Sequence, residues 1–356
     1  MGSYGVIRSD ILVGSFCVRN AQSKSGVQKT AIAGLLALSL SLAACTKENG
    51  PNPQESGVQG NATAQKSPAS SSPSGKVLPF ASILGMQKAG NILAVREKTV
   101  FHVGAIKDFY NGTQKKIDVH EACGALTATD QEFILPCPDG VHVVDARTPA
   151  THDVVTQEPA TVAIKTTSGE IIAGDSDTAS LKVHRSNKAT QSIKTEFITN
   201  QIVAIPVDGQ PDAVARVNNE HTVIQDIHWS EDKGGALLRV GRGVGQIAPA
   251  EQSILLASDT ISGQLMVYGA EDVIRLHQSS PVGVSPWAVA WDKKNQQAWV
   301  STTSDNKLTA YSISSGTADP KRHYSSVADV HSMVVLDDAT VIAGSATGDG
   351  LQIIAP

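Results

Sequence analysis

The residues of this sequence best suited to chemistry are histidines and carboxylates that fall in short polar segments between apolar ones. His120, His221 and His331 are three of these, and Glu121 and Asp329 lie beside the first and the third. Imidazole nitrogens and carboxylate oxygens are ligands that Zn²⁺ accepts, and three protein ligands leave one coordination position open for exchange. We therefore predict these five residues as zinc ligands, with ordinary surface side chains as the alternative.

Motifs of the common enzyme classes are missing from the chain. It contains no Gly-x-Ser-x-Gly elbow, no Walker loop, no His-Glu-x-x-His and no Cys-x-x-Cys pair. The glycine-rich run Arg239–Gly243 lacks the strand–loop–helix context of a phosphate site, so we expect a turn there. The sequence favours a protein that binds without catalysing. A lactonase-like hydrolase with a metal-bound water is the enzymatic alternative.

The cysteine at position 45 follows a short apolar segment. Thr30–Leu42 is about a dozen uncharged residues, too few for a membrane span of about 20 but typical of a signal-peptide core. It ends in Leu42-Ala43-Ala44-Cys45, the pattern of a lipoprotein cleavage site. We predict a signal peptide over residues 1–44, with a start of translation at Val27 as an alternative, and a diacylglycerol anchor on Cys45. The protein would then sit on the extracytoplasmic face of the cell membrane; an ordinary signal with an incidental cysteine is the alternative.

Two further cysteines, Cys123 and Cys137, are suited to a disulfide, which an oxidising compartment permits. Gly124–Thr129 and Glu132–Leu135 have the composition of two strands that turn around Asp130. Both cysteines lie equally far from this turn, so they face each other across the hairpin at a separation that a disulfide can bridge. Two buried free thiols are the alternative.

Composition divides the mature chain into two parts. Residues 45–76 are rich in Ser, Pro, Gly, Gln and Asn, and a segment that can bury so little apolar surface is expected to be a disordered tether. Residues 77–356 are rich in Val, Ile, Thr and Ala, which favours strands. The net charge is −5, without a basic run in this region, so we exclude nucleic acid as a partner.

A repeat of about 40 to 43 residues organises residues 77–356. Each unit holds a buried second strand and a third strand. The corresponding third-strand positions are Val103, Val144, His184, Gln225, Tyr268, Tyr311 and Ile354. A unit of four strands with this period is a β-propeller blade, so we predict an all-β, seven-bladed propeller. Val77–Ala81 would close the ring by completing the last blade. A pair of sandwiches and a six-bladed ring are the alternatives.

This fold would place the predicted zinc ligands on one face of the ring. In a propeller, the loops from strand four to the next strand one, and from strand two to strand three, lie on one face, which we call the loop face. The five predicted zinc ligands all fall in or beside these loops. Several turn aspartates fall there too, and these are expected to cap their own turns.

Two pairs of segments resemble known families. Val284–Ala290 and Ser304–Tyr311 look like the Tyr-Val-Thr-Asn type of propeller repeat, which serves many functions. Val119–Cys123 and Leu135–Val141 resemble the propeller-fold periplasmic zinc metallochaperones of the AztD type, which implies zinc delivery to the solute-binding protein of an ABC importer. The stretch Ala125–Thr127 lacks the histidine of that family. The overall layout resembles actinobacterial prolipoproteins of the LppL type.

Three functions follow as hypotheses. The first is a lipid-anchored, non-enzymatic propeller that binds a ligand or partner on its loop face, with zinc binding and hand-over as the sharpest version. The second is an accessory or scaffold subunit of an envelope membrane complex, which needs only protein-binding loops. The third is the lactonase-like hydrolase.

Overall fold

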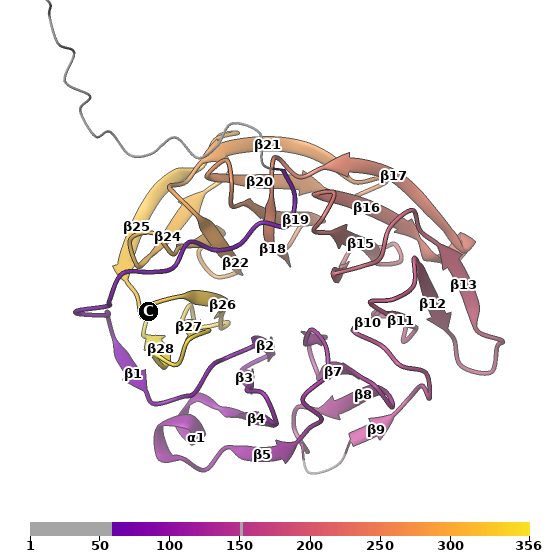
Figure 1. The fold of residues 1–356 in the computed structure, drawn as a ribbon, viewed down its shortest axis with the longest axis horizontal. Helices are drawn as coiled ribbons and strands as arrows, with labels where there is room; N and C mark the ends of the chain where they lie inside the picture. The colour runs from indigo at the N-terminus through magenta and orange to yellow at the C-terminus, as the bar shows by residue number, and fades with distance from the viewer. Residues whose placement is uncertain (1–58, 150–151) are drawn as a thin grey trace, which may run out of the picture. The chain divides into compact units, whose positions relative to one another are not determined.

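A computed structural model describes residues 59–149 and 152–356, which form seven four-stranded antiparallel sheets around a common axis (Figure 1). The prediction of an all-β, seven-bladed propeller is confirmed. All seven third-strand positions inferred from the repeat lie in the third strand of a blade. The buried second strands also lie where the repeat places them, because their near-continuous apolar runs pack against the neighbouring blade on each side.

The first four blades are numbered in chain order. Blade 1 consists of β2 (Gly85–Ala89), β3 (Ile92–Arg96), β4 (Val100–Ala105) and β5 (Lys115–Asp118); blade 2 of β6 (Thr127–Ala128), β7 (Glu132–Cys137), β8 (Gly140–Asp145) and β9 (His152–Val154); blade 3 of β10 (Val162–Lys165), β11 (Ile171–Gly174), β12 (Ser180–His184) and β13 (Gln191–Lys194); blade 4 of β14 (Gln201–Ile205), β15 (Ala213–Asn218), β16 (Val223–His228) and β17 (Lys233–Arg239).

The remaining blades follow the same order. Blade 5 consists of β18 (Val244–Pro249), β19 (Ile254–Asp259), β20 (Gln264–Gly269) and β21 (Arg275–Pro281); blade 6 of β22 (Pro286–Asp292), β23 (Gln297–Thr302), β24 (Lys307–Ser312) and β25 (Asp319–Ser325); blade 7 of β26 (Val330–Val335), β27 (Val341–Ser345) and β28 (Leu351–Ile354), with β1 (Lys76–Leu78) as its outer strand. Two short helices interrupt the pattern, α1 (Ile106–Asn111) and the 3₁₀ turn η1 (Trp229–Glu231).

The ring is closed by pairing the two ends of the propeller. Strand β1 runs antiparallel to β28, with Lys76 opposite Ile353 and Leu78 opposite Leu351. The sequence predicted this closing strand over Val77–Ala81, and the observed strand begins one residue earlier and ends at Leu78. Closure covers the outer backbone edge of β28, which would otherwise be free to pair with another chain.

Neighbouring blades pack against each other through large apolar side chains. Between blades 1 and 2, Phe101 of β4 and Phe133 of β7 meet edge to face with ring centroids 5.9 Å apart, and both side chains are fully buried. Burial of each such side chain contributes about 1.5–3 kcal/mol to folding. This packing fixes the angle between the blades and therefore the positions of the loops at their ends.

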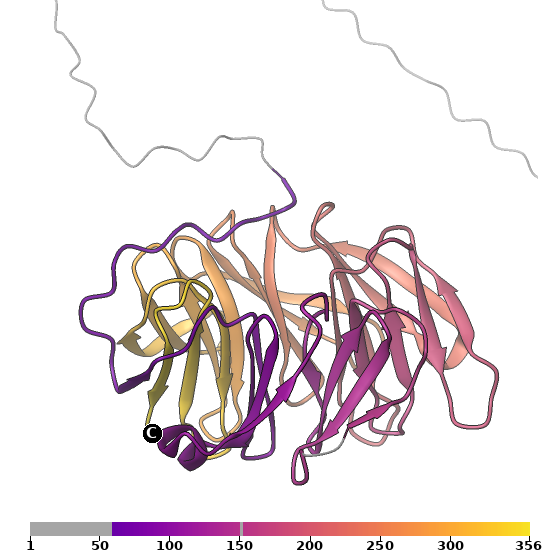
Figure 2. The ribbon, with the colours of Figure 1, turned by 60° about the horizontal axis from the view of Figure 1, so that its bottom comes forward.

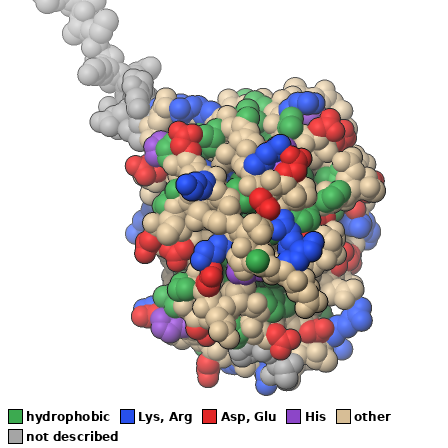
Figure 3. All heavy atoms as spheres, turned by 90° about the vertical axis from the view of Figure 1, so that its right-hand side faces the viewer, with side chains coloured by type: hydrophobic (Ala, Val, Ile, Leu, Met, Phe, Trp, Pro, Cys, Tyr) green, Lys and Arg blue, Asp and Glu red, His purple; other side chains and the backbone are tan. Residues whose placement is uncertain are grey.

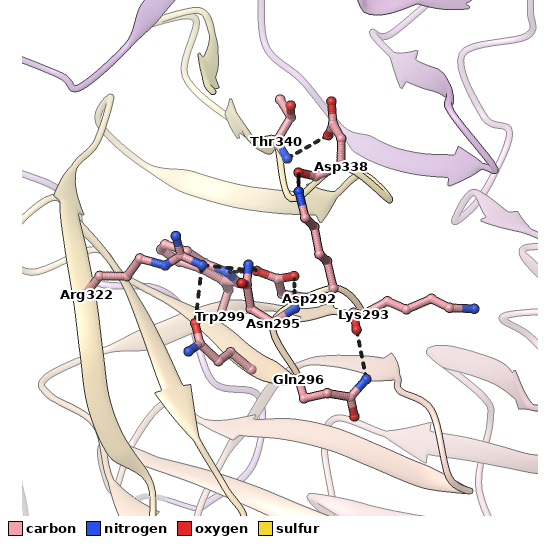
Figure 4. Close-up of polar contacts among 10 residues, drawn as sticks. Asp292, Lys293, Asn295, Gln296, Trp299, Arg322, Asp338 and Thr340 are labelled. Atoms are coloured by element: carbon pink, nitrogen blue, oxygen red, sulfur yellow. Dashed lines mark hydrogen bonds and ion pairs between the residues drawn. The ribbon is translucent and has the colours of Figure 1, made fainter. Parts of the chain in front are cut away.

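Blade 6 has an additional polar anchor on the opposite face (Figure 4). The fully buried carboxylate of Asp292 accepts hydrogen bonds from the backbone and side-chain nitrogens of Asn295, at 2.9 and 2.8 Å. The guanidinium of Arg322 lies 3.5 Å from the same carboxylate and over the ring of Trp299. Trp299 is also stacked with Tyr324. The cluster ties the first, second and fourth strands of the blade together.

Part of the segment that we predicted to be a disordered tether is ordered. Residues 59–75, which we call the strap, run over the loop face from blade 4 to blade 7 and lead into β1 (Figure 2). The prediction of disorder is wrong for this segment because it considered apolar burial alone. The strap is held by hydrogen bonds and by close backbone contact, and these need no large side chains. The rest of the predicted tether, with Cys45 and the predicted signal peptide, lies outside the described residues.

Gly60 illustrates the close contact. Its φ is +77°, which favours glycine, and a Cβ on this residue would lie 1.7 Å from the carbonyl oxygen of Glu220. Its amide donates a 2.8 Å hydrogen bond to the carbonyl of Arg242, and the amide of Asn61 donates a 2.7 Å bond to Asn219. The first described turn of the strap is thereby fixed against the loops of blades 4 and 5.

In the described part of the chain, no helix is long and apolar enough to cross a membrane.

Candidate functional site

The loop face carries the predicted zinc ligands, as the repeat implied. His120 and Glu121 lie in the loop between β5 and β6, and His221 lies in the turn between β15 and β16. Asp329 directly precedes β26, and His331 is the second residue of that strand. These residues belong to three separate parts of the ring: the junction of blades 1 and 2, blade 4, and blade 7. Within the described ranges, no three of them bring their ligand atoms within 4.8 Å of one another, so the predicted five-residue site does not form.

Local contacts explain why two of these side chains do not converge. The ring of His221 stacks on Phe197 with centroids 3.8 Å apart, and its Nδ1 lies 2.9 Å from the Asn218 side-chain oxygen. Glu121 forms a 2.7 Å ion pair with Lys98, and hydrogen bonding and charge attraction from this lysine lower the pKa of Glu121. Both side chains are satisfied by residues of their own neighbourhood.

Asp329 holds the strap. One carboxylate oxygen accepts a 2.8 Å hydrogen bond from the amide of Ser67, and the other accepts a 2.9 Å bond from the hydroxyl of Thr347. Burial alone would raise the pKa of Asp329, but these hydrogen bonds and the nearby His331 outweigh it, and the pKa is lowered. Its φ of +50° lies in the left-handed region. Because both oxygens are engaged, Asp329 serves as an attachment point for the strap.

His331 lies beside the ring of Trp287, with centroids 5.1 Å apart. Burial lowers the pKa of His331, against the opposing charge of Asp329, and thereby favours the neutral imidazole. A neutral imidazole can ligate a metal, but among the described residues His331 belongs to no group of three ligand-bearing side chains.

A cavity of about 340 Å³ lies at the junction of blades 1 and 2. Its apolar wall comes from both blades and includes Phe101, Ile117 and Leu135, and the disulfide cysteines Cys123 and Cys137 line it as well. The predicted disulfide is confirmed. The polar side chains of the cavity are those of Asp118, His120, Asp139 and His142.

The loop that carries His120 beside this cavity is held in place by hydrogen bonds and by the disulfide. Arg96 of β3, which is 5% exposed, donates hydrogen bonds to the carbonyls of Gly124 (3.1 Å) and Glu121 (3.3 Å). The amide of Gly124 donates to the carbonyl of Pro136, and the disulfide joins the same loop to the end of β7. Blades 1 and 2 therefore both hold this loop in a defined geometry.

Asp139 and His142 form a pair at the mouth of the cavity. Nε2 of His142 lies 2.8 Å from the Asp139 carboxylate, and this hydrogen bond is the main cause of the lowered pKa of Asp139. The sulfur of Cys137, a carboxylate oxygen of Asp139 and a ring nitrogen of His142 all lie within 4.8 Å of one another. It is the one such group of potential metal ligands in the part of the chain that the structure describes.

Sequence reasoning missed this group for an identifiable reason. Asp139 is one of the turn aspartates that are expected to cap their own turns, and His142 lies in a predicted third strand, where a structural role is expected. The tight turn between β7 and β8 pairs Cys137 with Gly140 and folds Cys-x-Asp-x-x-His onto itself, so spacing within the hairpin was the available signal.

Charge is distributed evenly on the side of the ring that carries the outer strands β13 and β17. Acidic and basic side chains are interspersed there, and no continuous basic surface appears (Figure 3). This agrees with the net charge of −5.

Comparisons with known proteins identify the fold. No protein-family model matches the chain, and no curated protein matches it. Among solved structures, a chain of a mitotic checkpoint complex is similar over 91% of this chain and 99% of that one, with a TM-score of 0.61 and 12% identity. A chain of the Kuenenia stuttgartiensis hydrazine synthase gives a TM-score of 0.58 with 11% identity, covering 83% and 99%.

The WD40 propeller domain of Doa1 is similar as well, with a TM-score of 0.56, 11% identity, and coverage of 84% of this chain and 97% of that one. At this level of identity the similarities extend to the β-propeller architecture alone. Function has to be inferred from the surface of this particular ring.

Proposed function

We propose that the protein is a lipid-anchored, non-catalytic β-propeller on the extracytoplasmic face of the membrane, whose loop face is directed toward the membrane and binds a protein partner there. The strap carries this proposal. Since residues 59–75 lie on the loop face, the chain that comes from Cys45 joins the folded body on that face.

The geometry limits how far the loop face can be from the anchor. About 14 residues separate Cys45 from Gln59, and a fully extended chain of this length spans at most about 50 Å. The point of entry is fixed by the contacts of Gly60 and Asn61 with the loops of blades 4 and 5. A tether that left from the opposite face would have to pass around the ring first. Attachment at the loop face instead keeps that face nearest to the membrane.

The loop face also carries exposed apolar side chains suited to a partner. Leu84 (52% exposed), Val155 (45%) and Val284 (59%) each lie in a loop that leads from one blade to the next on this face. Exposed apolar residues on rigid loops are typical of protein-binding surfaces. The similarity to a propeller chain in a mitotic checkpoint complex supports a protein partner in general. We therefore favour an accessory or scaffold subunit of an envelope membrane complex.

Zinc hand-over through His120, His221 and His331 is not proposed, because these histidines lie on separate blades. The hydrolase alternative needs a metal-bound water in the channel, and the only group of three potential metal ligands among the described residues lies at Cys137, Asp139 and His142 instead.

Photo-crosslinking in intact membranes tests the proposal. A photoreactive residue at Val284 on the loop face is compared with one at Val273, a valine in the β20–β21 loop of the opposite face that is also exposed. We expect adducts with membrane proteins from position 284 and few from position 273. Cys45→Ser should release the protein from the membrane fraction and abolish the adducts. Equal adducts from both faces, or full membrane retention of Cys45→Ser, would overturn the proposal.

A further inference from the structure

We infer that Cys137, Asp139 and His142 form a zinc site that becomes available when the Cys123–Cys137 disulfide is reduced. This inference concerns the cavity between blades 1 and 2 and goes beyond the proposed function of the loop face. It does not depend on lipid anchoring or on a protein partner.

The ligand atoms are already gathered. The sulfur of Cys137, a carboxylate oxygen of Asp139 and a ring nitrogen of His142 lie within 4.8 Å of one another, and zinc–ligand bonds of about 2.0–2.3 Å place ligand atoms about 3–4 Å apart. Asp139 and His142 already contact each other at 2.8 Å. The three residues follow one another through a single tight hairpin turn, so little backbone movement is needed to close the set around an ion.

The chemistry of the donor set favours zinc. A thiolate, an imidazole and a carboxylate are ligands that Zn²⁺ binds tetrahedrally, whereas Ca²⁺ and Mg²⁺ require oxygen ligands. Three protein ligands leave a fourth position for water or for His120, which lines the same cavity. The apolar wall, which includes Phe101 and Leu135, limits competing solvent around the ion.

The disulfide controls access to the sulfur. In the oxidised protein Cys137 is bonded to Cys123, and a disulfide sulfur is not a thiolate. A dithiol reductant would transfer two electrons and two protons to this bond and itself become a disulfide, which leaves two protein thiols. Zn²⁺ would then displace the proton of the Cys137 thiol and bind the thiolate together with Asp139 and His142. Thiol–disulfide exchange with a small disulfide, which accepts the two electrons and becomes two thiols, would re-form the Cys123–Cys137 bond and release the ion.

Cys123 does not belong to the ligand group, although its sulfur is bonded to that of Cys137. This asymmetry permits a matched pair of variants. Cys123→Ser and Cys137→Ser both remove the disulfide, but only Cys123→Ser leaves a free thiol beside Asp139 and His142. Loss of the disulfide is therefore the same in both proteins, and the ligand set differs.

The experiment uses the full chain with Cys17→Ser and Cys45→Ser, so that Cys123 and Cys137 are its only cysteines. Zn²⁺ binding is measured by calorimetry on the oxidised protein, on the reduced protein and on the two variants. Co²⁺ serves as a spectroscopic probe, because a thiolate ligand gives a charge-transfer band in the near ultraviolet. We expect the reduced protein and Cys123→Ser to bind at least about 100-fold more tightly than the oxidised protein, since even second-shell changes cost about 10–100-fold.

Three results decide the inference. The charge-transfer band should appear in Cys123→Ser, weaken strongly in Cys137→Ser, and be lost when His142→Gln is added to Cys123→Ser. Equal binding by the two cysteine variants would overturn the inference, and so would a band that survives His142→Gln. Circular dichroism of each variant identifies any that fails to fold, and the reduced wild-type chain then provides the same comparison without a substitution at either cysteine.

Discussion

Ser67 is the residue through which a small change should detach the strap. Its amide donates to the Asp329 carboxylate, its hydroxyl donates to the carbonyl of Thr303, and the same hydroxyl accepts from the Asp329 amide; each distance is 2.8 Å. Ser67→Ala keeps the first bond and removes the other two. A net contribution of about 1 kcal/mol per hydrogen bond gives a loss of about 2 kcal/mol in the free energy of strap opening.

Native-state hydrogen exchange measures this opening directly. A loss of about 2 kcal/mol corresponds to an approximately 30-fold decrease in protection for strap amides that are bonded to the loop face, such as those of Gly60 and Gln65. Amides in the buried second strands should be unchanged, because the propeller itself keeps its core. Ser71→Ala is the matched control, since the exposed side chain of Ser71 lies outside these contacts.

Two outcomes would refute the reasoning. Unchanged protection of the strap in Ser67→Ala would mean that its hydroxyl bonds do not hold the segment. A decrease that extends through strands such as β19 would mean that the strap unfolds only together with the propeller.

The other predictions concern the disulfide, the acid side of the pH range and blade 6. Cys123→Ser should lower the free energy of unfolding by about 3 kcal/mol, the chain-entropy value for a loop of about 15 residues, and calorimetry under reducing conditions should abolish the difference from wild type. Because the folded pKa of Asp329 is lowered, its stabilisation of the strap is complete above the unfolded pKa of about 3.9 and is lost as pH falls through the folded pKa. Hydrogen-exchange protection of the strap should therefore drop only below about pH 4. Asp329→Asn should weaken the strap already at pH 7, whereas the control Asp337→Asn should not. Asp292→Ala should lower the free energy of unfolding by about 2–4 kcal/mol in a denaturant titration, because it removes the fully buried carboxylate that accepts hydrogen bonds from Asn295 and from the buried indole N–H of Trp299; an effect below 1 kcal/mol would contradict the role of this anchor.

Much of the architecture could be predicted because it is repeated. The period places Val103, Val144 and the equivalent positions in third strands, and an error in one unit is corrected by the other six. The closing strand followed from counting strands in the last blade. The disulfide could be predicted because Cys123 and Cys137 are set by one local hairpin, in which sequence distance translates directly into spatial distance.

The strap could not be predicted from composition. Its stability comes from backbone amides, from hydroxyls such as that of Ser67, and from the close fit of Gly60 against Glu220. None of these contacts leaves an apolar pattern in the sequence. A segment can therefore lack a hydrophobic face and still be ordered when a rigid surface offers it hydrogen-bond partners.

The sequence predicts which face of the ring carries the candidate ligands, but not which of their side chains come together. The repeat correctly assigns His120, His221 and His331 to loop-face positions, but a ring of seven blades separates residues that share a face. Side-chain partners then decide their direction: Phe197 and Asn218 hold His221, and Lys98 holds Glu121. The pair Asp139 and His142 depends on the exact register of one turn, which the repeat alone does not give.

The orientation of the ring on the membrane can be measured by energy transfer from the protein to acceptor-labelled lipids. Blade 3 offers a matched pair of exposed serines, Ser176 in the β11–β12 loop of the loop face and Ser186 in the β12–β13 loop of the opposite face. Each is replaced by a labelled cysteine in the lipidated protein on vesicles. Stronger transfer from position 176 than from position 186 is expected if the strap directs the loop face to the membrane. Equal transfer, or stronger transfer from position 186, would contradict that orientation.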